Sequence, residues 1–322
     1  MRIIFVPQYP AKMRYQEWWF WKLPEEFKKC GYEVITLGQK YIDNNKSTSH
    51  DSEMFSSIHK SIEFETEQIK EYMQLNIKKD DILFVPELSF PGLFCNVLYH
   101  KRCSKMFAFC HATSLNKFDY FENIRKSKFM NESSHALLFN KIFIGSHYHK
   151  KKLLNGSESK LYWNKAIDIK LPFLPFIPIH PTEIKPKKHN IISVARPSIQ
   201  KINYIIENQI TELFGEIYRP KSNTWEEYFN NLSESKILLI SAREDTFGYQ
   251  IVDAVMNGCI PLAPNNLSYP EILPKEYLYN DINDLIKKIK LVLNNKIKPV
   301  KHLICEEEMI NFYKRIISEM EN

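Results

Sequence analysis

The chain contains few glycines and no segment that is long and apolar enough to cross a bilayer. Only 8 of its 322 residues are glycine, and no apolar run reaches the roughly 18 residues that a membrane-spanning helix requires. The first ten residues, MRIIFVPQYP, begin a strand pattern directly, so we expect no signal peptide. The sequence therefore predicts a cytoplasmic protein without stable membrane insertion.

Several familiar catalytic signatures are also missing. The chain has no Gly-x4-Gly-Lys phosphate loop, no Gly-x-Ser-x-Gly turn and no Asp-x-Asp metal motif, which disfavours kinases, esterases and metal-dependent glycosyltransferases. Its six cysteines include no Cys-x-x-Cys pair, so reduced and mostly buried thiols are expected. The sequence thus predicts neither a bound metal nor a required cofactor.

The composition suits two folded domains with a basic surface. A length of 322 residues corresponds to two domains of about 150 residues each. With 44% hydrophobic and 13% aromatic residues, the chain can form two substantial cores. The formal net charge of +6 and the pI near 8.8 fit a polyanionic partner such as nucleic acid without requiring one.

Short apolar runs alternate with helical patterns along the chain, which indicates doubly wound parallel sheets. In the first half, strands are predicted at 3–6, 33–37, 82–86, 106–110 and 141–145, and helices at 17–30, 53–77, 93–103 and 131–139. In the second half, strands are predicted at 191–195, 214–218, 236–241 and 259–263, and helices at 248–258 and 305–320. We therefore predict an α/β protein with two Rossmann-like domains.

Prolines mark the boundary between the two series. The stretch 171–189 holds 5 prolines and suits neither helix nor strand, so we interpret it as the interdomain linker. The predicted division is 1–172 for the first domain, 173–189 for the linker, 190–304 for the second domain and 305–322 for a C-terminal helix.

The segment 237–273 carries the most informative pattern. An apolar strand precedes Asp245, Phe247 and Gly248 follow it, and a helical pattern then bears Asp253, eight positions after Asp245. Unpaired N–H groups at the helix start, with Gly248 allowing close approach, suit a diphosphate or a sugar hydroxyl. The two carboxylates accept hydrogen bonds and could hold two hydroxyl-bearing sugars. The alternative is an ordinary βαβ unit whose acids are solvated.

At these residues the chain resembles the GT-B glycosyltransferases, in particular the retaining family 4 type. The signature of that type is Glu-x7-Glu with Phe-Gly inside it, followed by a small-residue helix, a glycine, a strand and a Pro-Glu pair. Asp245 and Asp253 stand in place of the two glutamates, and Pro270 and Glu271 form the final pair. The resemblance implies two domains facing a cleft, with the last helix returning to the first domain. The donor-binding residues that it implies in this segment are Asp245, Thr246, Phe247, Gly248 and Asp253.

A cationic pair precedes this motif by about 50 residues. Arg196 and Lys201 follow the strand predicted at 191–195. The resemblance implies that they bind the donor and neutralise its leaving diphosphate, because arginine gives forked contacts and lysine gives a mobile point charge. In a chain with 44 Lys and Arg residues, such a pair could also belong to a solvated surface.

In the first domain, His111 is the strongest candidate for a catalytic residue. It follows the strand predicted at 106–110, and open α/β sheets place ligands at the carboxyl ends of their strands. The resemblance implies that His111 contacts the transferred sugar, so that the catalytic set is His111, Arg196, Lys201 and Asp245. The alternative is a structural histidine at the end of a strand.

The loop after the first strand departs from the family pattern. Where many relatives have a glycine pair, this chain offers Lys12, Arg14, Trp18 and Trp19. Interleaved basic and aromatic residues could hold phosphates and stack an unpaired base, so we predict that these four residues bind the acceptor. The alternative is a helix that simply directs its aromatic side chains into the core.

Two further features are interpreted as solvated. The segment 147–152, HYHKKK, is basic, but no cysteine or acid accompanies it at metal-ligand spacing, so a solvated helix start is expected. Glu244, which precedes Asp245, is the clearest bystander among the acidic residues of the motif.

A narrower resemblance concerns the acceptor. The segments 138–154 and 258–274 look like the corresponding parts of the tRNA-queuosine mannosyltransferases, and the chain is also similar to bacteriophage enzymes that glycosylate hydroxymethylated pyrimidines in DNA. We therefore expect sugar transfer from a nucleotide sugar, with retention, to a hydroxyl on a modified nucleic-acid base. Phage DNA, in the host cytoplasm, is the preferred substrate. A tRNA acceptor, an envelope polysaccharide or lipid acceptor, and a GT-B-shaped binding protein without activity remain as alternatives.

Overall fold

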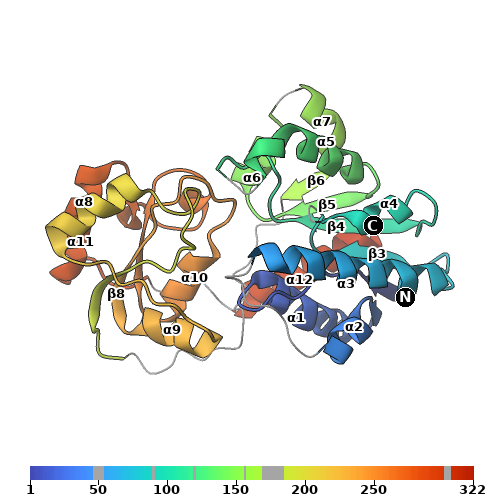
Figure 1. Ribbon diagram of the computed structural model, residues 1–322, viewed down its shortest axis with the longest axis horizontal. Coiled ribbons are helices and arrows are strands. Elements are labelled where there is room, and N and C mark those ends of the chain that lie inside the picture. The colour runs from blue at the N-terminus through green and yellow to red at the C-terminus, as the bar shows by residue number, and fades with distance from the viewer. Residues whose placement is uncertain (46–53, 89–90, 119–120, 156, 169–184, 301–305) are drawn as a thin grey trace.

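The computed structural model describes residues 1–45, 54–88, 91–118, 121–155, 157–168, 185–300 and 306–322. Figure 1 shows two lobes, and each is built around its own parallel sheet. Of the segment expected as the linker, 173–189, residues 173–184 lie outside the described residues. The two parallel sheets with their helices confirm the predicted α/β class.

The first lobe contains a six-stranded sheet in the order β2-β1-β3-β4-β5-β6. All of its neighbouring strands pair in parallel. Parallel strands need crossover connections, and helices provide them here. The strands are β1 Arg2–Phe5, β2 Glu33–Thr36, β3 Ile82–Val85, β4 Lys105–Cys110, β5 Lys141–Ile144 and β6 Ala166–Asp168. The helices are α1 Tyr15–Lys29, α2 Gln39–Asn45, α3 Met54–Gln74, α4 Leu93–Val97, α5 Arg125–Ala136, α6 His147–Leu153 and α7 Ser157–Trp163, with the 3-10 turn η2 Glu122–Ile124.

Both faces of this sheet are buried, as the two-residue period of a strand requires. Ile3 and Phe5 of β1 pack in one core cluster with side chains of α1 and α12. The alternate residues, Ile4 and Val6, pack in a second cluster with side chains of α3, α4 and α5. The apolar runs of the first half therefore form doubly covered strands.

The second lobe contains a four-stranded parallel sheet in the order β10-β9-β8-β7, and one core cluster surrounds it. Its strands are β7 His189–Ile192, β8 Ser235–Leu239, β9 Ile260–Pro264 and β10 Leu278–Tyr279. Its helices are α8 Tyr204–Phe214, α9 Trp225–Ser233, α10 Tyr249–Met256 and α11 Ile282–Leu293, with the 3-10 turns η3 Tyr269–Glu271 and η4 Lys275–Tyr277.

The last helix, α12 Glu306–Glu321, lies against the first lobe, where Figure 1 shows it near α1. Lys105 Nζ donates to the backbone carbonyl of Glu321 at 2.8 Å, and Lys141 Nζ reaches the Glu319 carboxylate at 2.9 Å. Cations at the C-terminal end of a helix satisfy its free carbonyls and complement its dipole. The polar contacts therefore fix the end of a helix whose apolar face is buried.

Several predicted elements differ from the structure. The helix predicted at 131–139 begins six residues earlier, as α5 Arg125–Ala136, and the strand predicted at 191–195 is β7 His189–Ile192. The strand predicted at 214–218 is wrong, because α8 continues to Phe214 and Gly215 ends it with a φ of +86°. Only Tyr218 then forms a bridge, to Ile192. The helix predicted at 93–103 is shorter than expected, since α4 ends at Val97.

Two other expectations can be compared with the described residues. Of the five cysteines described there, all are free thiols and four are buried, while Cys30 is exposed. Within the described ranges, no helix is both long enough and apolar enough to span a membrane.

The buried face of α12 gives a test of how this helix contributes to stability. Ile316 is completely buried in the first-lobe core, so Ile316→Ala is expected to lower the free energy of unfolding by about 2–5 kcal/mol. Lys314→Ala, on the exposed side of the same helix, should change it by less than about 0.5 kcal/mol. Urea denaturation of both variants measures the difference. Equal effects would show that α12 is not part of the core.

Candidate functional site

The loop between β8 and α10 adopts a conformation that depends on glycine. Gly248 has a φ of +100°, and a Cβ atom at this position would lie 2.9 Å from a ring carbon of Tyr269. Any other residue would therefore be strained and would collide with a buried ring. In front of this turn, Asp245 accepts a hydrogen bond from the Tyr269 hydroxyl at 3.2 Å and one from the backbone N–H of Phe247 at 3.4 Å. The turn thus fixes the Asp245 carboxylate at the start of α10.

Lys201 reaches the same carboxylate from the neighbouring loop. Its Nζ lies 3.2 Å from Asp245 Oδ2 and 3.5 Å from the backbone carbonyl of Glu244. Lys201 and the half-buried Arg196 both lie in the segment that follows β7, and β7 and β8 are adjacent strands. The carboxyl ends of adjacent parallel strands therefore bring the predicted Lys201 and Asp245 into contact, with Arg196 in the same loop.

Asp253 lies inside α10 and is almost fully buried. Its carboxylate accepts a hydrogen bond from the Tyr228 hydroxyl at 3.0 Å. Burial is the main cause that raises the pKa of Asp253 to about 7, and the bond from Tyr228 opposes this rise. A carboxyl group held at a cost in an interior position is a candidate for a functional role.

In the first lobe, His111 follows β4 and is held by an acid from the adjacent strand β3. His111 Nδ1 lies 3.1 Å from Glu87 Oε2, and the Tyr15 hydroxyl donates to the same oxygen at 2.8 Å. A carboxylate at Nδ1 favours the tautomer with the proton on that nitrogen, which leaves Nε2 as an acceptor. His111 Nε2 is buried and has no hydrogen-bond partner among the described residues. The arrangement holds one acceptor nitrogen ready for a ligand.

The two lobes meet at Tyr249, the first residue of α10. Its ring centroid lies 5.7 Å from that of Tyr15, 6.3 Å from that of His111 and 4.9 Å from that of Phe247. Burial is the main cause that raises the pKa of Tyr249, and the charges of Glu87, Asp253 and Asp245 raise it further. Acids from both lobes therefore surround one ring, so His111 and the acidic motif face a common region.

Glu244, predicted to be a solvated bystander, instead joins the two lobes. It is 4% exposed, and its carboxylate lies 2.7 Å from Lys152 Nζ and accepts a bond from the Tyr148 hydroxyl at 3.2 Å. The backbone N–H of Lys117 also approaches it at 3.4 Å. All three partners lie in the first lobe, so Glu244 is bonded across the lobe interface and is not solvated. A single sequence gives no indication of contacts made across a domain interface.

The segment 147–152, predicted as a solvated helix start, is the other half of this interface. Glu271 accepts hydrogen bonds from the backbone N–H groups of His147 at 2.7 Å and Tyr148 at 2.6 Å. Ser146 donates from its hydroxyl to the Thr246 carbonyl at 2.6 Å. The N-terminal turn of α6 is therefore capped by an acid of the other lobe, because its free N–H groups attract negative charge.

The residues predicted to bind the acceptor divide into two kinds. Trp18 and Trp19 are 6% and 2% exposed and belong to the first-lobe core, which matches the core-facing alternative. The ring of Trp19 packs against that of His111, with centroids 4.8 Å apart. Lys12 and Arg14 precede α1 and are half-buried. In this conformation Trp19 packs against His111, and neither tryptophan presents an open face for stacking.

Several site residues were not identified from the sequence. Glu87 directly follows β3, and its position at a strand end next to the strand of His111 could have identified it. Tyr249 follows Gly248 and could have been recognised as the first side chain of the helix. Tyr228 and Tyr269 gave no such signal, because their contacts with the two aspartates depend on how separate elements pack.

We expect the contacts of Glu244 to hold the two lobes together. Glu244→Gln removes the charge that faces Lys152, and it should lower the free energy of unfolding by about 2 kcal/mol and increase the radius of gyration in X-ray scattering. A matched control is Glu234→Gln, since Glu234 pairs at 2.8 Å with a Lys188 that is 62% exposed. An exposed pair contributes at most about 1 kcal/mol. An unchanged radius of gyration would show that the contacts of Glu244 do not hold the two lobes together.

Asp253 should impose a pH dependence on stability. An unfolded aspartate titrates near pH ~3.9, whereas the folded pKa is about 7. The folded state therefore binds the proton more tightly, and the contribution of Asp253 is lost as pH rises from about 4 through 7. Asp253→Asn should be as stable as the unmodified protein at pH 4 and more stable at pH 8, by an amount on the order of a few kcal/mol. Denaturant unfolding at both pH values checks this, and equal stability at pH 8 would contradict it.

The site can be compared with known proteins. No family model matches the chain. The tRNA-queuosine alpha-mannosyltransferase of Drosophila melanogaster is 47% identical over 64 residues, which are 20% of this chain and 17% of the fly protein. The chain thus matches only a small part of that relative's length.

Two solved structures match over the full length of both chains. Anabaena HepE in complex with UDP and glucose has a TM-score of 0.64 at 10% identity. An alpha-glucosyltransferase in complex with UDP and a 13-mer DNA containing an HMU base has a TM-score of 0.54 at 11% identity. At such identities the likeness establishes architecture. Two parallel-sheet domains that meet at Tyr249, together with these matches, show that the chain has the GT-B fold of the nucleotide-sugar glycosyltransferases.

Proposed function

We propose that this protein transfers a sugar from a nucleoside diphosphate sugar, with retention of anomeric configuration, to a hydroxyl group on a modified nucleic-acid base. The observation that carries the proposal is the convergence of Lys201 and Asp245 from one lobe with His111 from the other around the ring of Tyr249. A cation, short acids and an imidazole acceptor are the groups that an activated sugar requires.

Each group has a task in the proposed reaction. Lys201, with Arg196 in the same loop, stabilises the negative charge on the departing diphosphate. Asp245 accepts hydrogen bonds from the transferred sugar, and the start of α10 after Gly248 offers N–H groups to the phosphates. His111 Nε2 accepts a hydrogen bond from a hydroxyl group of the transferred sugar, because Glu87 holds the other ring nitrogen. Asp253 binds the ribose.

Retention follows from an attack on the same face that the leaving group departs from. The acceptor hydroxyl forms a bond to the anomeric carbon, the bond from that carbon to the diphosphate oxygen breaks, and the diphosphate takes the hydroxyl proton. The protein supplies positioning and charge stabilisation, and the proposal requires neither a metal nor a cofactor.

The comparisons support this choice of donor and acceptor class. UDP occupies both the HepE structure and the alpha-glucosyltransferase structure, so UDP-sugars are the first donors to test. The alpha-glucosyltransferase structure also contains DNA with a modified base, and the net charge of +6 favours a polyanion. We therefore prefer hydroxymethylated pyrimidine DNA as the acceptor, modified in the host cytoplasm by a phage-encoded enzyme.

A tRNA base is the second candidate. The 64-residue match to the fly tRNA-queuosine alpha-mannosyltransferase is a specific observation in its favour. Both candidates place the accepting hydroxyl on a base, so a duplex substrate would have to extrude that base into the cleft. An envelope polysaccharide or lipid acceptor requires neither base recognition nor nucleic-acid binding.

The function can be tested in two steps with one variant pair. A UDP-sugar at 100 times its dissociation constant should stabilise the protein by about 2.7 kcal/mol in a thermal-shift panel. Lys201→Ala should lower the affinity for that UDP-sugar by about ten- to a hundredfold, because a charge-assisted contact is lost. Lys188→Ala, at an exposed lysine, should leave the affinity unchanged. Mass spectrometry of nucleosides from treated DNA and tRNA should then detect the added sugar, and NMR its configuration.

The negative outcomes are distinct. The proposed donor site would be contradicted if no nucleotide sugar stabilised the protein. It would also be contradicted if a nucleotide sugar stabilised Lys201→Ala as much as the unmodified protein. Donor binding with transfer only to lipid or polysaccharide would contradict the acceptor class. An inverted product would contradict retention, and loss of transfer in EDTA would contradict independence from metals.

A further inference from the structure

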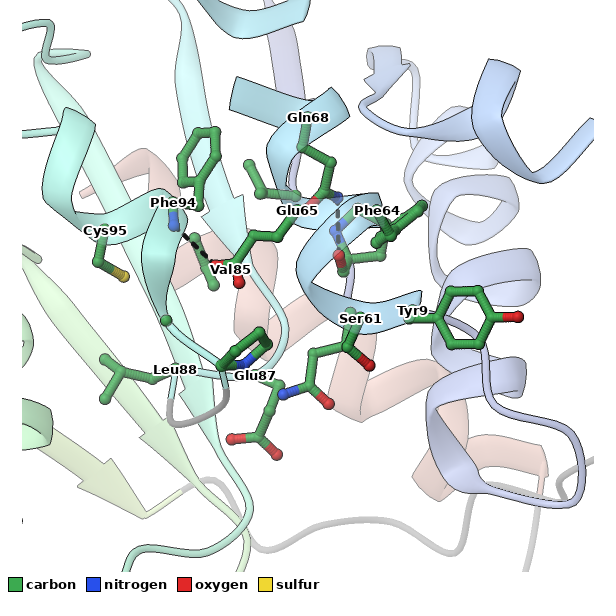
Figure 2. A pocket seen from close by; sticks show the side chains of 15 residues that line it. Tyr9, Ser61, Phe64, Glu65, Gln68, Val85, Glu87, Leu88, Phe94 and Cys95 are labelled. Carbon is green, nitrogen blue, oxygen red and sulfur yellow. Dashed lines mark hydrogen bonds between the residues drawn. The ribbon is translucent and has the colours of Figure 1, made fainter. Parts of the chain in front are cut away.

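A small pocket lies at the carboxyl edge of the first sheet, and Glu87, which contacts His111, is one of its lining residues. It is lined by the segments after β1 and β3, by α3 and by the start of α4 (Figure 2). Its volume is about 20 Å³, which is room for one ordered water or one small polar group. The edge of the sheet that carries His111 is also where open α/β folds bind ligands.

The pocket contains a buried carboxylate oxygen without a partner. Glu65 extends from α3, is 7% exposed, and accepts a hydrogen bond from the backbone N–H of Phe94 at 2.7 Å through Oε1, which Figure 2 marks as a dashed line. Its Oε2 is buried and forms no hydrogen bond of good geometry in the described chain, although the backbone N–H groups of Leu93 and Gly92 lie close enough to lower the pKa of the carboxyl group. A buried, unsatisfied acceptor costs free energy, so a ligand that donates to it recovers that cost.

The electrostatic surroundings favour a donor rather than another acceptor. Glu87 lines the same pocket, and the buried Glu132 lies nearby on α5 beside Lys128, at 3.8 Å. Lys128 is the cation that acts on Glu65, and burial still raises the pKa of Glu65 to about 7. The carboxylates therefore outnumber the cation around this small space.

Glu87 connects the pocket to the transfer centre. It lines the pocket and also holds His111 Nδ1 at 3.1 Å. A group bound at Glu65 would therefore share its pocket with the residue that holds His111. On a cytosine ring, the exocyclic amine and a 5-hydroxymethyl group are on adjacent carbons, so a base whose amine occupied the pocket would carry its hydroxyl on the neighbouring carbon, and Glu87 links the pocket to His111.

We propose that the Glu65 pocket selects an acceptor base by its exocyclic amine, with Glu65 Oε2 accepting the amine hydrogen bond and Glu87 on the side toward His111. The proposal rests on the proposed function, since it assigns the base edge that this transferase reads. Carboxylates are suited to the amine of cytosine, whereas a uracil presents a carbonyl oxygen in the same place. When Glu65 is ionised, the pocket therefore favours 5-hydroxymethylcytosine over 5-hydroxymethyluracil, so the comparison is made at pH 8.

The test compares two duplexes that differ only in this base. With a saturating UDP-sugar, the unmodified protein should transfer to 5-hydroxymethylcytosine with a kcat/KM about ten- to a hundredfold higher than to 5-hydroxymethyluracil. In Glu65→Gln the amide oxygen can keep the bond to Phe94, while an NH2 group replaces Oε2. The ratio of kcat/KM for 5-hydroxymethylcytosine to that for 5-hydroxymethyluracil should fall to about one or below, because the pocket now offers a hydrogen-bond donor. Equal transfer by the unmodified protein, or an unchanged ratio in the variant, would overturn the proposal.

Glu132→Gln is the matched control. Glu132 is 2% exposed and accepts from the Ser114 hydroxyl at 2.8 Å, and it does not line the pocket. The same substitution at similar burial should alter the melting temperature of the protein and leave the base preference unchanged. A loss of preference in this variant as well would indicate a general structural effect and overturn the role of Glu65.

A binding measurement separates this proposal from the proposed function. In the presence of UDP, the nucleoside 5-hydroxymethyldeoxycytidine should raise the melting temperature more than 5-hydroxymethyldeoxyuridine does, and Glu65→Gln should abolish the difference. Absence of sugar on every nucleic acid, with this difference intact, would refute the proposed function and leave the pocket assignment standing. Transfer without any difference between the nucleosides would refute the pocket assignment alone.

Discussion

The whole site depends on the contact between the carboxyl ends of two separate parallel sheets. Each sheet presents polar side chains at that edge: the second lobe contributes Lys201 and Asp245, and the first lobe contributes His111 with Glu87. Glu244 with Lys152, and Glu271 with the first turn of α6, hold the two edges together. Both acids belong to the same lobe as Asp245, and they flank the motif in sequence. The segment that contains Asp245 and Asp253 therefore also makes the contacts between the two lobes.

Buried carboxyl groups lower the stability of this fold. Burial raises the pKa of Asp253, Glu65 and Glu132 to about 7 in each case. These groups therefore oppose folding at neutral and higher pH, and a protein selected for stability alone would replace them with neutral residues. Two of the three lie where a ligand with hydroxyl or amine donors is proposed. Their burial is consistent with recognition sites that become satisfied on binding.

The architecture and the chemical centre were accessible from the sequence for different reasons. The strand and helix alternation predicted both sheets, because apolar runs such as that of β4 are buried on both faces. Asp245, Gly248 and Asp253 were selected as candidates because a strand, a turn and a helix carry them at the spacing of the family signature. Long-range side-chain contacts have no such local pattern. The role of Glu244, the burial of Trp19 and the bridge at Tyr218 all result from packing between elements distant in the chain.

The replacement of two expected glutamates by aspartates has a structural explanation in two tyrosines. The Tyr269 hydroxyl reaches Asp245 at 3.2 Å, and the Tyr228 hydroxyl reaches Asp253 at 3.0 Å. Each tyrosine comes from a different element, so the short carboxylates are fixed by partners that the helix itself does not supply. A hydrogen bond from a tyrosine occupies one acceptor site of a carboxylate and leaves others for a sugar hydroxyl. In the proposed donor site, a shorter acid held in a fixed orientation would take the place of a longer and more mobile one, and the absence of a side chain at Gly248 lets the Tyr269 ring pack against the turn and reach Asp245.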